Sequence, residues 1–559
     1  MAESSPTLRI AGGTVYDPVH DVDGRVMDLW VADGRIVPPP DDPGAYSGRT
    51  VDASGFAVMP GGIDMHCHVA GPKVNAGRLM SPAAFREGPA IRRTPSTRSG
   101  LVGRVPTTGA TGHLFAGIGY TTAMDAAIPP LHARAAHDEL LATPILDNGF
   151  YALLGNAHRV LDCAARDDQE ALDAYCAWAL DAAKGFAIKV VNPGDVEDYK
   201  QVSRKAVREL DEDVVGFGAS PRQVVRGLAA SADRLDLPHP VHIHCNNLGI
   251  PGNWRTTLAT MEALEGHRGH FAHIQFHSYG GDPSDPRSFR SAVPKLLDHV
   301  RRHKELTVDV GHVSPGPAMI LTGDPRAGDR LHRQLGGPWY NADVEQEGSC
   351  GVIPIEYLPE KNLIAAVQWA IALEWYLLMD DPWRVALTSD HPNGGAFYRY
   401  PEMIYLLMDR AFRAEALATM PGALRDRSVI HELDREYSLS EVAILTRAAP
   451  ARMLGLDARK GHLGPGADAD IAIYSPDRDR RAMFGRPRWV FKSGAMVVED
   501  GIVVAEPVGR TFVTAPGYDP GRLPAIREWF ERDYSVRFAN YAIPGDALPT
   551  AEVVPGGGG

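Results

Sequence analysis

The sequence predicts an α/β protein in which a (β/α)8 barrel of the TIM type carries a small β-sandwich domain formed from both the N- and C-terminal segments. Three observations support this fold class. The chain has 559 residues, and a barrel of this kind needs roughly 250. Its middle alternates short apolar runs with helical patterns, which is typical of a parallel sheet. Both ends carry short strand patterns. We therefore expect the sandwich at 1–59 and 451–545, the barrel at 60–450 and a flexible tail at 546–559.

The two ends are predicted to be strands because apolar and polar residues alternate there between Gly, Asp and Pro turns. The strand patterns cover 8–17, 28–37, 50–60, 468–476, 487–504 and 510–516. Since the two ends of a domain often lie close together, one sandwich can be built from both segments.

The middle of the chain provides the barrel elements. We expect strands at 57–66, 120–127, 186–191, 240–245, 271–276, 306–311 and 385–390. We expect helices at 169–184, 220–235, 361–379 and 438–456. Ser438 and Glu441 have the spacing of a capping box at the start of the last helix. No GxGxxG follows a strand and no Walker A motif occurs in the sequence, so nucleotide binding loses its usual support.

Composition excludes several function classes. The net charge of −13 disfavours general nucleic-acid binding, which relies on basic patches. The five cysteines form no CxxC pair, so a disulfide framework is not expected and a reducing cytoplasm fits best. The sequence has neither a signal-peptide pattern nor an apolar run of about 20 residues, so we expect a cytoplasmic protein without a membrane span.

Two histidines, His66 and His68, end the first apolar run of the barrel region in the sequence PGGIDMHCH. Positions i and i+2 of a strand point to the same face, so both imidazoles can reach one ion. The end of a barrel strand is also where such enzymes place functional residues. Two solvent-facing histidines at a strand end would give the same pattern.

Lys189 lies inside the apolar run GFAIKVV, in a chain with only ten lysines among its 57 basic residues. A buried ammonium is costly unless it is paired or neutralised. One solution is pairing with a carboxylate. The other is reaction of the neutral amine with CO₂, which gives a carbamate that can bridge two metal ions. Taken alone, the residue is explained more simply as an exposed lysine at a strand end.

Two further apolar runs contain histidine pairs. His242 and His244 share a strand face, and His244 is better placed because it lies nearer the C-terminal end. His273 and His277 are four residues apart, so we place His273 near the end of its run and His277 in the following loop. Neutral imidazole is a common metal ligand. A core histidine would explain each of these residues singly.

Asp390 ends the run VALTSD, where an N-cap or turn aspartate is also common. The joint order is more informative than any single residue, because HxH, Lys, His, His and Asp each end a separate apolar run. Six nitrogen and oxygen donors of this kind suit a pair of zinc-like ions. The candidate ligands are His66, His68, Lys189, His244, His273 and Asp390.

The order HxH, Lys, His, His, Asp resembles the amidohydrolase superfamily, which includes dihydroorotase, hydantoinase and urease. Residues 460–476 resemble the segment with which these chains re-enter the small β-domain. Five stretches are also similar to the A subunit of formylmethanofuran dehydrogenase, and equally to its bacterial counterpart, the A subunit of the formyltransferase/hydrolase complex. These stretches are 68–80, 188–195, 242–254, 273–281 and 387–397.

The resemblance implies two zinc ions bridged by an N6-carboxylated Lys189. It places His66 and His68 on one ion and His244 and His273 on the other. It makes Lys189 and Asp390 the catalytic residues, with Asp390 as both ligand and base. The implied reaction of one-carbon metabolism is hydrolysis of N-formylmethanofuran, or a close analogue, to formate and the free amine.

Asn246 and Tyr279 follow ligand strands and are candidate substrate contacts, although turn hydrogen bonds would explain them equally well. The implied partners are a formyltransferase subunit and the other subunits of that complex, with neither nucleic acid nor membrane. The arginine-rich, lysine-poor composition favours the bacterial form.

Three alternatives stay open. The first is the archaeal form, which works beside a molybdenum or tungsten subunit and can run formate condensation. The second is a cyclic amidase of the dihydroorotase or hydantoinase type. The third, a non-catalytic scaffold, is disfavoured because the full ligand set is intact.

Overall fold

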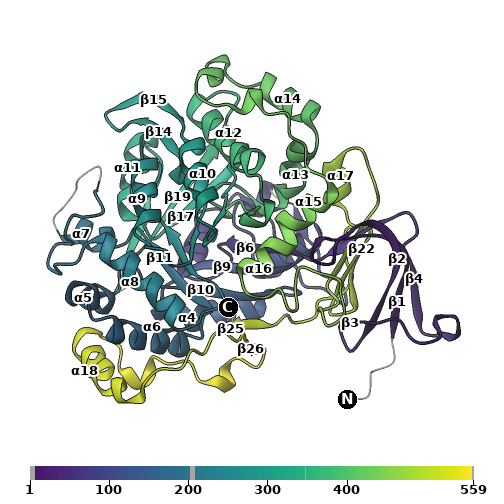
Figure 1. Ribbon diagram of the computed structural model, residues 1–559, viewed down its shortest axis with the longest axis horizontal. Helices are drawn as coiled ribbons and strands as arrows, with labels where there is room; N and C mark the ends of the chain where they lie inside the picture. Colours follow the sequence, from purple (N-terminus) through teal and green to yellow (C-terminus); the bar gives the residue numbers. More distant parts are fainter. Residues whose placement is uncertain (1–6, 88, 202–207, 346–347, 557–559) are drawn as a thin grey trace.

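The computed structural model describes residues 7–87, 89–201, 208–345 and 348–556. Within these ranges eight parallel strands form a nearly closed barrel with helices outside it, which confirms the predicted fold class (Figure 1). The strands follow one another around the barrel in chain order. They are β6 (Gly62–Cys67), β9 (Tyr120–Ile128), β10 (Asp147–Leu153), β11 (Ala187–Val191), β12 (Val241–His244), β13 (Gly269–Phe271), β16 (Leu306–Asp309) and β20 (Val385–Ala386).

The barrel closes between its first and last strands. The backbone N–H of His68 donates to the carbonyl oxygen of His391 over 2.7 Å, and Cys67 and His391 form a parallel bridge. Every residue of β9, β10 and β11 is buried, as expected for parallel strands covered on both faces. Strand β10 is not predictable from its sequence, DNGFYAL, which contains Asn and Gly and lacks β-branched residues.

Helices cover the outside of the barrel and connect its strands. They are α3 (Thr108–Ala116), α4 (Ala133–Ala142), α5 (His158–Arg166), α6 (Gln169–Ala183), α7 (Asp195–Gln201), α8 (Pro221–Arg234), α9 (Trp254–Glu262), α10 (Val293–Arg302), α12 (Leu363–Leu378), α13 (Tyr400–Met408) and α14 (Arg410–Ala418). Side chains cap α6, α8 and α12: Asp168, Ser220 and Asn362 accept backbone N–H bonds at their starts.

The predicted helix at 438–456 is present but divided. It consists of α15 (Leu439–Ala443), a π-helical turn (Ile444–Ala448) and α16 (Ala449–Met453). The predicted capping box is present, because Ser438 accepts from the backbone of Glu441 while the Glu441 side chain accepts from the backbone of Ser438.

Both ends of the chain contribute to one mixed sheet of nine strands among the described residues, seen at the right of Figure 1. Its strands are β1 (Leu8–Asp17), β2 (Val22–Ala32), β3 (Arg35–Val37), β4 (Arg49–Asp52), β5 (Ala57–Pro60), β21 (Ile471–Tyr474), β22 (Trp489–Lys492), β23 (Ala495–Glu499) and β24 (Ile502–Val503). The two ends meet where β5 pairs antiparallel with β21. The sheet packs around its own apolar core, which includes Ile10, Leu29 and Phe491.

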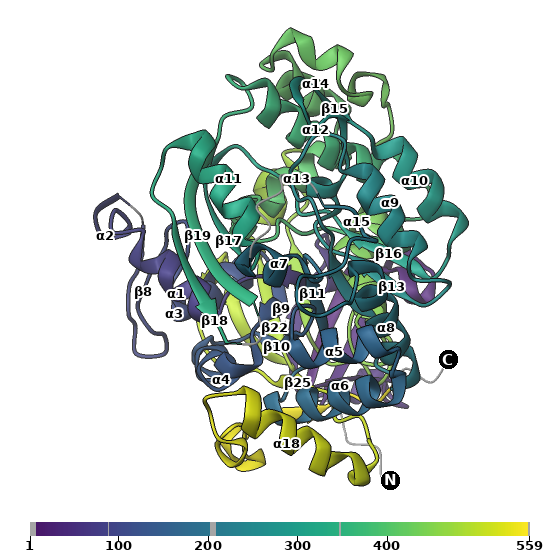
Figure 2. The same cartoon turned by 90° about the vertical axis from the view of Figure 1, so that its left-hand side faces the viewer.

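The C-terminal segment differs from the predicted boundary. β25 (Thr511–Val513) pairs with barrel strand β10 instead of joining the small sheet. α18 (Leu523–Asp533) lies beside α6 in Figures 1 and 2, and just beyond α18 Phe538 stacks on Trp178 of α6 with ring centres 5.4 Å apart. The small sheet therefore ends with β24. The sequence of α18 does not indicate whether its apolar face packs on the barrel or on the small sheet, so the boundary could not be predicted locally.

Part of the predicted flexible tail is a strand, which corrects that expectation. β26 (Ala551–Val553) pairs in parallel with β25, and Val554 after it is buried. The strand could not be predicted locally, because its backbone hydrogen bonds go to a distant segment, Thr511–Val513. The last residues of the tail, 557–559, lie outside the described residues.

Inserted elements surround the C-terminal ends of the barrel strands. A three-stranded sheet flanked by α11 (Pro325–Leu335) lies to the left of the barrel strands in Figure 2. The strands of this sheet are β17 (Gly316–Thr322), β18 (Tyr340–Val344) and β19 (Gly348–Tyr357). The remaining α-helices and strands of the described ranges are α1 (Pro72–Leu79), α2 (Ala84–Glu87), β7 (Ala90–Ile91), β8 (Gly100–Leu101), β14 (Tyr279–Asp282), β15 (Asp285–Ser291) and α17 (Arg480–Gly485).

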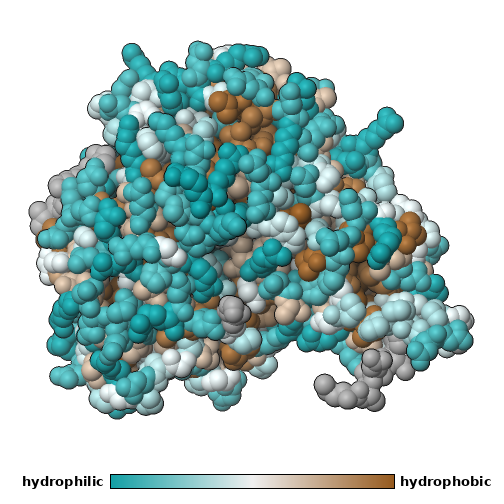
Figure 3. Space-filling model, in the orientation of Figure 1, coloured by the Kyte–Doolittle hydropathy of each residue, from teal (hydrophilic) through white to brown (hydrophobic). Residues whose placement is uncertain are grey.

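Every helix in the described ranges is too short or too polar to cross a lipid bilayer. The face shown in Figure 3 is mostly hydrophilic, with scattered apolar groups.

Candidate metal centre

A cavity of about 920 Å³ opens at the C-terminal ends of the barrel strands, where barrel enzymes place their active sites. Its size is typical of a small-molecule site. All six ligands predicted from the sequence line it: His66, His68, Lys189, His244, His273 and Asp390. The structure therefore brings together residues from the first, fourth, fifth, sixth and eighth strands or the loops that follow them.

One cluster lies where the first and last strands meet. Nε2 of His66 and Nε2 of His68 lie 3.1 and 3.2 Å from Oδ1 of Asp390. One ligand atom from each of the three residues lies within 4.8 Å of the others. Asn393 donates from Nδ2 to the same oxygen over 2.9 Å, which helps to fix the carboxylate. These three side chains can share one ion.

Lys189 occupies the centre of β11 and is 1% exposed. Its Nζ has no hydrogen-bond partner among the described residues. Burial lowers the pKa of the amine to about 7, against the opposing pull of the Asp309 and Asp390 carboxylates. A large fraction of this lysine is therefore uncharged near neutral pH, and the uncharged amine is the form that can take up CO₂.

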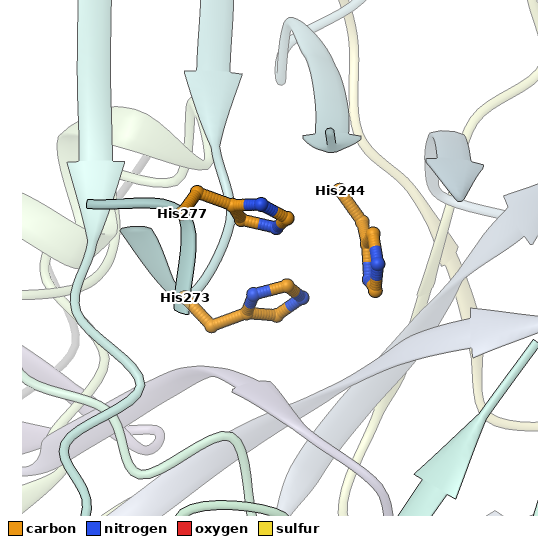
Figure 4. A group of neighbouring side chains, drawn as sticks. All are labelled: His244, His273 and His277. Carbon is orange, nitrogen blue, oxygen red and sulfur yellow. The ribbon is translucent and has the colours of Figure 1, made fainter. Parts of the chain in front are cut away.

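A second cluster consists of His244, His273 and His277, whose rings face one another in Figure 4. The ring of His244 lies 4.7 Å from that of His273 and 5.0 Å from that of His277. We predicted His277 to lie in a loop, whereas it ends a short 3-10 helix that begins at Ile274. His273 before it adopts a left-handed φ of 33°, and this turn brings the two rings together. The spacing of His273 and His277, four residues apart, is the feature of the sequence that could have indicated this contact.

The donor atoms fit divalent metal ions. Buried polar atoms in proteins are almost always hydrogen-bonded. Here Nζ of Lys189, Nε2 of His244, Nδ1 of His273 and both ring nitrogens of His277 are buried and lack a partner among the described residues. Imidazole nitrogen and carboxylate oxygen are the donors that zinc and similar ions take. A bound ion would satisfy groups that the protein leaves unpaired.

Two buried carboxylates provide the negative charge of the site. Burial alone would raise the pKa of Asp390, but His273 and His66 hold it well below its ordinary value. The pKa of Asp309 is likewise held well below its ordinary value, despite burial, chiefly by His66 and His270. Both carboxyl groups are therefore ionised at neutral pH.

Asp309 was not among the site residues predicted from the sequence, although its strand was predicted. It ends β16, the seventh barrel strand. Its carboxylate contacts Nδ1 of His66 at 3.0 Å and accepts from the backbone N–H of His273 at 3.0 Å and from Oγ1 of Thr388 at 2.7 Å. Asp309 therefore holds residues of both candidate ligand groups in place within the barrel.

The remaining predicted residues differ in whether they line the cavity. His244 lines the cavity, while His242 is fully buried and contacts His66 instead. Tyr279 lines the cavity and accepts hydrogen bonds from two glutamine side chains. Asn246 is fully buried, and its amide donates to the carbonyl of Pro193. It is not among the described residues that line the cavity, so direct contact with substrate is not supported.

The fold and this cavity define a metal-dependent hydrolase, and comparison with known proteins identifies its family. Residues 49–498 match the amidohydrolase family, so the chain belongs to that family. It is 42% identical over 556 residues to protein FwdA of Methanocaldococcus jannaschii, covering 96% of each chain. It is 39% identical over 553 residues to the A subunit of the formyltransferase/hydrolase complex Fhc of Methylorubrum extorquens, covering 97% of each.

A solved structure supports the same relationship. The formyltransferase/hydrolase complex (FhcABCD) from Methylorubrum extorquens, crystallised in complex with methylofuran, contains a chain that superimposes with a TM-score of 0.91. The two chains are 37% identical, and the match covers 98% of this chain and 99% of that one. The resemblance found in the sequence motifs is therefore confirmed over nearly the whole chain.

Proposed function

We propose that this chain is the hydrolase subunit of a formyltransferase/hydrolase complex. It hydrolyses N-formylmethanofuran, or a close analogue, to formate and the free amine in one-carbon metabolism. The observation that carries this proposal is the match to the A subunit of Fhc over 97% of both chains, together with a cavity that collects all six predicted ligands. In this proposal the partners are a formyltransferase subunit and the other subunits of the complex, in the cytoplasm.

The proposed ligand set holds two divalent ions, most simply zinc. His66, His68 and Asp390 hold one ion, and His244 and His273 hold the other. Lys189, as an N6-carboxylated lysine, would supply oxygen donors to both ions. His277 offers a third imidazole to the second ion because its ligand atom lies within the same 4.8 Å cluster. Such a pair of ions polarises a carbonyl group and lowers the pKa of water when bound.

Asp390 moves the proton in this reaction. Its carboxylate accepts a proton from the attacking water as the new C–O bond forms at the formyl carbon. It returns that proton to the amide nitrogen as the C–N bond breaks, so the amine leaves in neutral form. Asn393 holds the carboxylate in place through its hydrogen bond to Oδ1. The products are the free amine and formic acid, which releases its remaining proton to solvent and becomes formate.

The cavity wall suits a ligand with an apolar portion and negative charge. Phe276, Phe289 and Ile320 contribute apolar surface, and Lys73 and Arg330 contribute cationic side chains. Arg330 is half-buried, and desolvation lowers its pKa. The wall therefore gives a formylated carrier both an apolar contact surface and cations to neutralise anionic groups. Tyr279 is the proposed substrate contact that lies in this wall.

The test is elemental analysis of the purified complex combined with a formate-release assay on a formylated furfurylamine carrier. Two metal ions per chain and formate release that stops with a chelator would support the proposal. Two ions without formate release would leave the metal centre standing and refute the substrate.

A second candidate is the corresponding role in a formylmethanofuran dehydrogenase, favoured by the 42% identity to protein FwdA. Molybdenum or tungsten in the copurified complex would favour this candidate. A formyltransferase subunit in the complex would favour the first.

A further inference from the structure

Beneath the candidate metal centre, three buried imidazoles form a hydrogen-bonded chain. Nδ1 of His66 lies 2.9 Å from Nε2 of His242. Nδ1 of His242 lies 3.0 Å from Nε2 of His239. The chain ends at the backbone carbonyl of Met453, 2.7 Å from Nδ1 of His239. All three rings are fully buried. His239 precedes β12, so the chain runs from the cavity floor toward the N-terminal end of the barrel.

The carbonyl end of the chain fixes the direction of every hydrogen bond. A carbonyl oxygen only accepts, so Nδ1 of His239 donates to Met453. A neutral imidazole has one N–H and one acceptor nitrogen. Nε2 of His239 therefore accepts from Nδ1 of His242. By the same rule, Nε2 of His242 accepts from Nδ1 of His66.

The other end of the chain gives the same answer independently. Oδ2 of Asp309 lies 3.0 Å from Nδ1 of His66. An ionised carboxylate only accepts, so it also requires the proton of His66 to be on Nδ1. That proton is shared between Asp309 and His242. On the other side of the ring, Nε2 of His66 lies 3.1 Å from Oδ1 of Asp390. An ion bound at these two atoms would take the place of the proton that Nε2 donates to this carboxylate without metal.

We propose that His242 and His239 are positioning residues that hold His66 in its Nδ1–H tautomer, so that Nε2 presents its lone pair to a metal ion. This inference rests on the proposed function, in which His66 is a ligand. The outer hydrogen-bond partner of a ligating histidine fixes both its tautomer and its ring orientation. The hydrogen-bonded chain of imidazoles ends on the carbonyl oxygen of Met453, which takes up no proton at neutral pH. These imidazoles therefore orient the ring of His66 and do not conduct protons.

This role explains why both histidines of the HxH pair on β12 face the barrel interior. His244 lies at the level of the cavity and lines it. His242 lies one layer deeper, pairs in register with Lys189 and contacts His66. The two residues thus serve the same centre at different depths, one as a proposed ligand and the other as the partner of a ligand.

The first test compares zinc affinity in two variants at one position. His242→Leu removes both hydrogen bonds and is expected to weaken zinc binding by about 10- to 100-fold. His242→Gln keeps an acceptor and a donor and is expected to recover most of the affinity. Zinc affinity is measured on the metal-depleted complex by competition with a chromophoric chelator. Wild-type affinity in the leucine variant, or equal loss in both variants, would refute the proposal.

A matched control removes a buried histidine elsewhere. His137 on α4 is buried and contacts the carbonyl of Ala183 over 3.0 Å, outside the chain of three rings. His137→Leu therefore costs a comparable hydrogen bond and is expected to keep wild-type zinc affinity. Loss of zinc in this variant would mean that any buried imidazole has the same effect, which would also refute the positioning role.

The second test needs no variant and reads the protons directly. Neutron diffraction from deuterium-exchanged crystals of the wild-type complex should show deuterons on Nδ1 of His239, His242 and His66. A deuteron on Nε2 of His242 would overturn the proposal. Neither test uses formate release. Failure of the proposed function would show as two bound zinc ions without formate, whereas failure of this inference would show in the affinities or the deuteron positions.

Discussion

Nε2 of His68 lies 3.2 Å from Oδ1 of Asp390, so the first and last strands of the barrel meet at one carboxylate oxygen. The same oxygen lies 3.1 Å from Nε2 of His66 and accepts from Nδ2 of Asn393. An ion held by the two histidines would therefore be next to the group that we propose as proton carrier. Coupling of metal binding and proton transfer at one side chain makes Asp390 the most informative residue to change.

Asp390→Asn keeps the side chain's shape and one oxygen but removes the proton acceptor. We expect kcat for formate release to fall by about 10²- to 10⁴-fold, with most of the metal retained. The measurement pairs kinetics with elemental analysis of the same preparation. Asp329→Asn changes another cavity carboxylate, on α11, and should keep turnover close to wild type. Wild-type turnover in the Asp390 variant would contradict the assignment.

Lys189→Ala removes the proposed bridge between the two ions. We expect the metal content to fall below two ions per chain and activity to be lost. A short carboxylate such as propionate should partly restore both, because the shortened side chain leaves space for it. Lys189→Met fills that space and should not respond. Elemental analysis with and without propionate checks this, and a fully loaded, active alanine variant would exclude the bridge.

His277→Gln tests the third imidazole of the second cluster. If His277 contributes to the second ion, the variant should bind that ion more weakly, while the ion at His66 and His68 is retained. Zinc titration of the metal-depleted complex measures the two affinities separately. His312→Gln is the matched control, since His312 is also buried with both ring nitrogens unpaired among the described residues. Two unchanged affinities would remove His277 from the ligand set.

Asp324 gives a prediction for pH. Burial raises the pKa of this carboxyl to about 6, with help from the nearby Asp195. In an unfolded chain the pKa is about 3.9. The folded state therefore binds the proton more tightly than the unfolded state. Ionisation of Asp324 lowers the free energy of unfolding, with the full effect above about pH 6 and no effect below about pH 4.

Asp324→Asn should consequently stabilise the protein at pH 8, by up to about 3 kcal/mol, with an advantage that shrinks toward pH 4. The asparagine oxygen can still accept from the backbone of Ala327 at the start of α11. Urea unfolding at pH 5 and pH 8 measures the effect. The exposed Asp298→Asn variant should show no such change with pH. An equal effect of Asp324→Asn at both pH values would contradict this account.

Lys460 forms the centre of a buried charge cluster between the barrel and the small sheet. Its Nζ contacts Asp147 of β10, lies 3.0 Å from Asp468 and lies 2.6 Å from Asp470. Lys492 also contacts Asp147 and Asp470, so Lys460→Met would remove one of two lysines from these carboxylates. We therefore expect a loss of about 3 kcal/mol in unfolding free energy, the lower end of the range for a broken buried pair.

Lys184→Met removes a partly exposed pair with Asp181 and should cost at most about 1 kcal/mol. Denaturant unfolding of both variants gives the comparison. Similar losses in the two would show that the buried cluster adds no particular stability.

The sequence was sufficient for residues whose role depends on a local pattern. His66, Lys189 and Asp390 each interrupt or end an apolar run, so both their strands and their position at the cavity could be predicted. Parallel strands buried on both faces give such runs directly. Strand β10 was missed because Asn148 and Gly149 break that pattern.

The remaining features depend on contacts between distant segments. Asp309 matters because His66, His273 and Thr388 reach its carboxylate from three other parts of the barrel. His277 joins its cluster through the left-handed turn at His273, which no local propensity indicates. The pairing of the tail strand with β25 is equally non-local.

The junction of β5 with β21 also constrains how the protein is made. Val58 pairs with Ile473, a residue synthesised roughly 400 positions later. At typical elongation rates the ribosome needs roughly 20 to 80 s to cover that distance. During this interval the first five strands expose an unpaired edge, which is a template for aggregation. The nascent N-terminal strands therefore depend on protection until the C-terminal strands emerge, and a chain truncated before β21 would remain incomplete however well its barrel had formed.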